Sequence, residues 1–194
     1  MTSYAPTTAL IVVDCQNDFA APEGSLFVNG AERVIAEVNR HVISAVSAGA
    51  PVVYTQDWHP ESTPHFEKDG GIWPVHCVAE TWGAEFHPRL VVAGPGVRKG
   101  SNGEDGYSGF TMRDPETGEE TPTELHEMLQ SRRATGVVVV GLALDYCVKA
   151  TALDAVELGY EVSMPLAATA AVNLAAGDGD SAAAEVASAG ATVA

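Results

Sequence analysis

Three reactive side chains each follow a stretch of sequence that is predicted to form a β-strand. Asp14 comes directly after the apolar run 9–13, and Lys99 and Cys147 follow later runs of this kind. A carboxylate can accept a proton, a lysine supplies a fixed positive charge, and a cysteine thiolate is a nucleophile. If the fold brings these side chains together, they supply the groups that nucleophilic catalysis needs.

Cys147 is predicted to lie in the first turn of a helix. The positive end of the helix dipole should lower its pKa below the ordinary value of ~8.5, and a nearby lysine should lower it further. Backbone N–H groups of the turn 142–147 could also hold an oxyanion. The alternative interpretation is a buried cysteine that packs as a small apolar side chain.

Asp14 and Lys99 also have ordinary alternatives. An aspartate after a strand often caps a turn, and most lysines are solvated surface charges. The combination of the three residue types favours the catalytic interpretation over each of these separate explanations.

A second group of candidate residues lies between residues 57 and 76. In an extended segment, Asp57 and His59 point to the same face, since they are two residues apart. With His65 and His76 they offer one carboxylate and three imidazoles, which are ligand types of zinc, iron(II) and manganese. The alternative is a set of loop histidines with local hydrogen bonds.

The elements that must position these residues alternate between strands and helices. Apolar, β-branched runs predict six strands, at 9–13, 51–55, 95–98, 136–141, 161–164 and 191–193. Helical periodicity and capping signals predict helices at 30–47, from 121, at 145–157 and from 181. This alternation predicts a single α/β domain over residues 1–194, with a three-layer α/β/α arrangement and a mostly parallel six-stranded sheet.

This fold would bring the reactive residues to one place. Asp14, Asp57, Lys99 and Cys147 all stand near the carboxyl ends of strands, where open α/β sheets bind their ligands. The stretch 57–95 has little periodicity, and so long an irregular segment is usually functional. The polar segment 101–120 is predicted to be an exposed loop.

Composition excludes several classes of partner. A formal net charge of −16 would repel phosphates, so nucleic acid is not expected as a partner. No run approaches the ~18 apolar residues that cross a bilayer, and no secretory signal is visible. Three cysteines do not suggest a disulfide framework, so we expect a cytoplasmic protein. The sequence leaves self-association into a homo-oligomer open.

Seven short segments, in order along the chain, resemble those of the nicotinamidase/pyrazinamidase family of the isochorismatase-like cysteine hydrolase superfamily. They are 14–19, 57–60, 65–66, 73–77, 99–100, 107–110 and 141–148. Single matches of this length carry little information, but seven in family order are specific. The resemblance implies the isochorismatase-like hydrolase fold.

The resemblance also implies roles for individual residues. Asp14, Lys99 and Cys147 would form the catalytic triad, and the backbone N–H groups of Ala143 and Cys147 would form the oxyanion hole. A cis peptide bond is implied between Leu142 and Ala143. In the implied reaction, Asp14 accepts the thiol proton, the thiolate attacks an amide carbon, and ammonia leaves from a thioester that water hydrolyses.

The implied cofactor is one divalent metal ion, with zinc as the first choice and iron(II) or manganese as alternatives. Its ligands would be Asp57, His59, His65 and His76. The implied substrate contacts are Phe19 and Trp73, which would sandwich a pyridine ring, together with Tyr107. The small-molecule amide would be nicotinamide, hydrolysed to nicotinic acid and ammonia in NAD salvage, with pyrazinamide as a further substrate.

Three alternatives compete with this assignment. A different cysteine amidohydrolase, such as an N-carbamoylsarcosine amidohydrolase, would share the triad, but these relatives generally lack the metal cluster. An isochorismatase would lack the nucleophile Cys147. An idle metal-binding or redox-sensing module would keep the histidines without releasing ammonia. The sequence also departs from the family at Leu144, where a threonine is usual, and in an acidic loop at 113–120 that is expected to affect substrate access or assembly.

Overall fold

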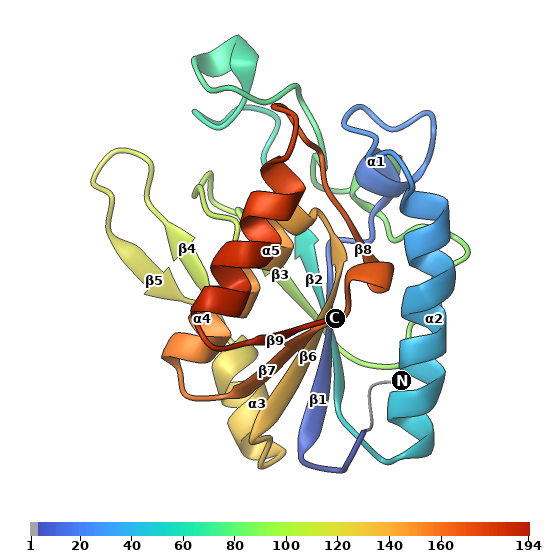
Figure 1. The fold of residues 1–194 in the computed structure, drawn as a ribbon. Coiled ribbons are helices and arrows are strands. Elements are labelled where there is room, and N and C mark those ends of the chain that lie inside the picture. Colours follow the sequence, from blue (N-terminus) through green and yellow to red (C-terminus); the bar gives the residue numbers. More distant parts are fainter. Residues whose placement is uncertain (1–3) are drawn as a thin grey trace.

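A twisted β-sheet forms the centre of the molecule, seen in the computed structural model, which describes residues 4–194 (Figure 1). Residues 1–3 of the predicted domain lie outside this range. The main strands are β1 (Thr8–Val13), β2 (Val52–Asp57), β3 (Gly96–Lys99), β6 (Gly136–Leu142), β7 (Glu161–Met164) and β9 (Thr192–Val193). They follow the order β3-β2-β1-β6-β7-β9, and all neighbouring pairs are parallel.

The predicted six strands are therefore present, and the sheet has a seventh. Strand β8 (Thr169–Ala170) pairs in parallel with the end of β6. Its two residues are too few to produce a periodic pattern, so sequence reasoning could not find it.

The central strands bury side chains on both faces of the sheet. In β1, Leu10 and Val12 belong to one apolar core, whereas Ile11 and Val13 belong to the other. An uninterrupted apolar run is what a parallel strand covered on both faces requires.

Helices supply the two covering layers (Figure 1). Helix α2 (Ala31–Ser47) packs on one face, and α3 (Leu125–Ser131), α4 (Lys149–Glu157) and α5 (Asp178–Ser188) pack on the other. The short helix α1 (Asn17–Ala20) follows β1. The predicted three-layer α/β/α architecture is confirmed.

The prediction of an exposed loop at 101–120 is wrong in part. An antiparallel hairpin of β4 (Thr111–Arg113) and β5 (Glu120–Pro122) occupies its second half. Pro122 ends β5, so the expected helix start at 121 is also wrong and α3 begins at Leu125. The hydroxyl of Thr123 accepts a hydrogen bond from the Leu125 N–H at 3.2 Å and serves the start of that helix.

The predicted helix at 145–157 consists of two parts. A π-helical turn at Leu144–Val148 precedes α4, and Cys147 lies in this turn. The last helix, α5, begins at Asp178, three residues before its predicted start. Within residues 4–194, no helix has both the length and the apolar character that crossing a membrane requires.

Candidate active site

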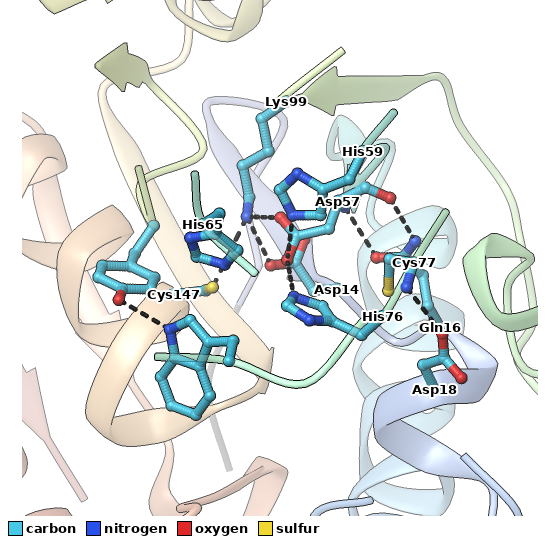
Figure 2. Close-up of polar contacts among 12 residues, drawn as sticks. Asp14, Gln16, Asp18, Asp57, His59, His65, His76, Cys77, Lys99 and Cys147 are labelled. Atoms are coloured by element: carbon cyan, nitrogen blue, oxygen red, sulfur yellow. Dashed lines mark hydrogen bonds and ion pairs between the residues drawn. The ribbon is translucent and has the colours of Figure 1, made fainter. Parts of the chain in front are cut away.

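The register of the sheet brings the reactive residues together at one edge. Asp57 and Lys99 end β2 and β3 and are direct partners across the two strands. Asp14 follows β1, which runs beside β6, and β6 leads into the turn that carries Cys147. The predicted clustering at the carboxyl ends of the strands is therefore confirmed (Figure 2).

Lys99 lies at the centre of this cluster, and only 1% of it is exposed. Its Nζ is 3.0 Å from Asp14 Oδ2 and 3.6 Å from Cys147 Sγ, and it also pairs with Asp57 (Figure 2). A carboxylate oxygen of Asp14 lies within 4.8 Å of the sulfur. A base, a cation and a nucleophile thus share one buried site.

The charges of the carboxylates and the lysine depend on one another. Burial opposes the charged forms of Asp57 and Lys99. Lys99 nevertheless holds the pKa of Asp57 well below its usual value, and the negative charges of Asp14 and then of Asp57 hold the pKa of Lys99 well above its own. Burial raises the pKa of Asp14, although Lys99 favours its charged form. Lys99 therefore keeps its positive charge at neutral pH.

The prediction of a lowered pKa for Cys147 is wrong. Burial is the largest cause and raises the pKa of this thiol well above its ordinary value. Lys99 acts in the opposite direction, and the negative charges of Asp14 and Asp57 add to the rise. The thiol is consequently protonated at rest. A nucleophilic attack from Cys147 requires a base that removes its proton.

Three imidazoles surround the other side of Asp57. Ring nitrogens of His59, His65 and His76 lie within 4.8 Å of one another, and all three residues are buried. Asp57 Oδ2 is 3.8 Å from Nε2 of both His59 and His76. Neither ring nitrogen of His59 has a hydrogen-bond partner within the described part of the chain. Buried imidazole nitrogens without partners beside a carboxylate fit a bound divalent cation.

Backbone and side-chain contacts that sequence reasoning missed hold these candidate ligands in place. The Gln16 amide donates to the carbonyl of Asp57 at 2.7 Å and accepts from its N–H at 2.8 Å, as a neighbouring strand would (Figure 2). A carboxylate oxygen of Asp105 lies 2.8 Å from Nδ1 of His65. Asp105 in turn pairs with Arg113 of β4 at 3.2 Å, so the hairpin is tied to this cluster.

Gly100 belongs to one of the segments that resemble the family, but its structural role was not predicted from the sequence. Its φ is +78°, and a Cβ at this position would lie 2.7 Å from the ring of His59. Only glycine therefore lets the chain turn after Lys99 with the imidazole so close.

A pocket with about 360 Å³ of empty space, a volume that includes open solvent, extends from Cys147 to His65 and His76. Its lining is mostly aromatic or apolar and comprises Phe19, Leu26, Asp57, His65, Trp73, His76, Tyr107, Leu142, Ala143, Tyr146, Cys147 and Val172. All three predicted substrate contacts line it. Tyr146 packs edge-on against Trp73 with ring centroids 4.9 Å apart, and sequence reasoning did not identify it.

The strand leading to Cys147 has an unusual backbone. The peptide bond between Leu142 and Ala143 is cis, as predicted. Leu144 packs in the apolar core instead of offering a hydroxyl. The next residue, Asp145, ties the turn to the pocket wall by accepting the N–H of Val172 at 2.9 Å.

Known proteins resemble this chain along nearly its whole length. The model of the isochorismatase domain matches residues 8–194. The nicotinamidase of Escherichia coli is 35% identical over an alignment of 207 positions, gaps included, which covers 97% of this chain and 94% of that protein.

Two solved structures have the same fold at similar identity. An L. infantum protein in complex with nicotinate superimposes with a TM-score of 0.87 at 36% identity, covering 100% of this chain and 95% of that one. The pyrazinamidase of Pyrococcus horikoshii in complex with zinc gives a TM-score of 0.86 at 37% identity, covering 97% and 99%. With its fold, its pocket and these relatives, the chain belongs to the isochorismatase-like hydrolases, and within them to the nicotinamidase/pyrazinamidase family.

Proposed function

We infer that this protein is a nicotinamidase, which hydrolyses nicotinamide to nicotinic acid and ammonia. The observation that carries this inference is Lys99 Nζ within 3.0 Å of Asp14 and 3.6 Å of Cys147, at the edge of an aromatic pocket beside three clustered histidines. One domain over residues 1–194 would carry the whole activity. The setting we propose is NAD salvage in the cytoplasm.

Covalent catalysis begins with the protonated thiol of Cys147. Asp14 accepts its proton, and the thiolate attacks the carboxamide carbon to give a tetrahedral oxyanion. The backbone N–H groups of Ala143 and Cys147, both in the pocket wall, donate to that oxyanion. Asp14 then returns the proton to the leaving nitrogen, and ammonia departs from a thioester.

The second half of the reaction uses the same base. Asp14 takes a proton from water, which attacks the thioester, and nicotinic acid leaves as Cys147 recovers its proton. Lys99 keeps its charge throughout. Its position between Asp14 and the sulfur favours the carboxylate before proton transfer and the thiolate after it.

The aromatic residues of the pocket would orient the ring. Phe19 and Trp73 offer flat apolar surfaces for a pyridine ring, and the Trp73 N–H donates to the hydroxyl of Tyr107 at 3.1 Å, which fixes the indole. A planar aromatic carboxamide is the class of substrate that such a pocket accepts.

We propose that Asp57, His59, His65 and His76 hold one divalent metal ion, with zinc as the first choice and iron(II) or manganese as alternatives. Two carboxylate-to-imidazole distances of 3.8 Å and the unpartnered nitrogens of His59 support this ligand set. When bound, such an ion supplies a Lewis-acidic contact for a ring nitrogen and so helps to orient the substrate.

The carboxylate of Asp105, which contacts Nδ1 of His65, should be needed for tight metal binding. Asp105→Ala should weaken zinc affinity about 10- to 100-fold, because it removes the group that orients the imidazole and increases its basicity. His59→Ala should lose the metal altogether. Both effects can be measured by competition with a chromophoric chelator and by elemental analysis.

A matched control is available in the neighbouring hairpin. Asp114 accepts local hydrogen bonds from the backbone N–H groups of Glu116 and Thr117, and within residues 4–194 it forms no hydrogen bond or ion pair with a histidine. Asp114→Ala should therefore bind zinc like the unsubstituted protein. Equal affinities for Asp105→Ala and Asp114→Ala would show that Asp105 does not support the metal site.

The function itself is tested with a small panel of amides. Purified protein should release ammonia from nicotinamide and pyrazinamide, and much less from benzamide, whose ring has no nitrogen to bind. N-carbamoylsarcosine serves as the comparison for a related amidohydrolase. If nicotinamide stays intact while another amide is hydrolysed, the substrate assignment is wrong and the cysteine mechanism stands.

A further inference from the structure

We propose that Thr55 is a positioning residue that holds the Asp14 carboxylate in the orientation needed to take the proton from Cys147. The role of Asp14 as the base is part of the proposed function, and the inference about Thr55 rests on it. Within the part of the chain that the structure describes, the hydroxyl of Thr55 bonds to Asp14 and not to the thiol, so it acts through Asp14.

Thr55 lies in β2, beside β1, and is completely buried. Its hydroxyl donates to Asp14 Oδ1 at 2.6 Å and accepts a longer hydrogen bond, 3.3 Å, from the Asp14 N–H. One side chain therefore contacts both the backbone and the carboxylate of the proposed base.

Asp14 needs such a contact because its backbone lies outside the sheet. The residue follows the last residue of β1 and has a φ of +45°, a conformation that residues other than glycine rarely adopt. A residue in this region persists only where its surroundings hold it there. The two hydrogen bonds with Thr55 help to stabilise this backbone conformation of Asp14.

The hydrogen bond to Thr55 also gives the two carboxylate oxygens of Asp14 different roles. Oδ1 accepts from Thr55, whereas Oδ2 is 3.0 Å from Lys99 Nζ and makes no hydrogen bond that satisfies normal geometry among the described residues. Because the only hydroxyl proton of Thr55 is committed to Oδ1, Oδ2 remains the oxygen available for a transferred proton. General base catalysis depends on this kind of alignment.

The side chain of Thr55 has a second, separable contact. Its γ-methyl group packs so close to Gly109 that a Cβ on that glycine would lie 2.8 Å from it. Thr55→Val keeps this methyl and the shape of the side chain but removes the hydroxyl. Thr55→Ser keeps the hydroxyl and removes the methyl, so the two variants separate positioning from packing.

The test compares these variants by steady-state hydrolysis of nicotinamide and by the rate at which iodoacetamide alkylates Cys147, followed by mass spectrometry. Thr55→Val should lower kcat by roughly 10- to 100-fold with little change in KM, because substrate binding does not involve the hydroxyl. Alkylation of Cys147 should slow in parallel. Thr55→Ser should stay within a few-fold of the unsubstituted protein on both measures, and metal content should be the same in all three proteins.

Two results would overturn the proposal. Thr55→Val with unaltered kcat and alkylation rate would show that the hydroxyl is dispensable, and equal losses in the valine and serine variants would assign the effect to the methyl. If Thr55→Val does not fold, Thr55→Ala removes the same hydroxyl without adding volume, and its comparison with Thr55→Ser decides. Alkylation needs no substrate, so this measurement tests the role of the Thr55 hydroxyl even if nicotinamide is not the substrate.

Discussion

Replacing Cys147 by alanine should reduce nicotinamide hydrolysis to the background rate, a loss on the order of 10⁴-fold or more. Without the sulfur no thioester can form, and the remaining Asp14 and Lys99 have no nucleophile to activate. The residue is 6% exposed and its side chain is small, so the fold should survive the change. Ammonia release measures the activity, and circular dichroism with zinc content shows that the protein is intact.

Cys15 provides the matched control. It is a completely buried cysteine that packs in the core on the opposite face of the sheet from Cys147. Cys15→Ala should keep the activity, because this side chain belongs to the apolar core on the other face of the sheet and has no assigned role in the reaction. Substantial hydrolysis by Cys147→Ala would refute the assignment of the nucleophile, whatever the control shows.

Lys99→Met should abolish activity and also lower the free energy of unfolding by about 3–5 kcal/mol. Methionine has a similar length but no charge, so Asp14 and Asp57 would remain as two buried carboxylates without their shared cation. Removing one partner of a buried ion pair leaves the other charge uncompensated, and here one substitution leaves two carboxylates uncompensated. Urea unfolding measures the difference.

The stability deficit of Lys99→Met should depend on pH in a defined direction. Without the cation, burial would raise the pKa of both carboxylates above their values in the unfolded chain. Groups with a raised folded pKa contribute stability at low pH and lose it as the pH rises through that pKa. The deficit should therefore be smallest in acid and should grow toward neutral pH.

Lys68 is the control for this substitution, since its side chain is 45% exposed and, among the described residues, its one ion pair is with Asp69. Lys68→Met should change the free energy of unfolding little at any pH, as expected for a solvated ion pair. If Lys99→Met is as stable as Lys68→Met, the ammonium does not hold the two carboxylates together.

The arrangement of the site was predictable because it follows from topology. Once 9–13 and 136–141 are recognised as buried parallel strands, Asp14 and Cys147 must lie at the same edge of the sheet. The family resemblance added the metal ligands and the cis peptide bond. The structure brings His65 together with His59 and His76, although the sequence distance from His65 to His76 alone could not fix this.

What could not be predicted depends on contacts between segments far apart in sequence. The sequence identifies Thr55 only as a β-branched residue in a strand, and its hydrogen-bond partner Asp14 lies 41 residues away. Asp105 belongs to a stretch that is polar throughout, so its contact with His65 has no sequence signal. The direction of the Cys147 pKa shift was missed because it depends on burial and on two carboxylates as well as on the helix.

The position of Lys99 has a consequence for how the two halves of the site respond to each other. A single ammonium contacts both the proposed base Asp14 and the proposed metal ligand Asp57. A change in the charge of one carboxylate therefore changes the electrostatic stabilisation that Lys99 gives to the other. Such coupling is reciprocal in free energy. Whatever metal binding does to the ionisation of Cys147, ionising Cys147 must do to metal affinity by the same factor, and substitutions in the two halves should give non-additive effects in double-mutant cycles.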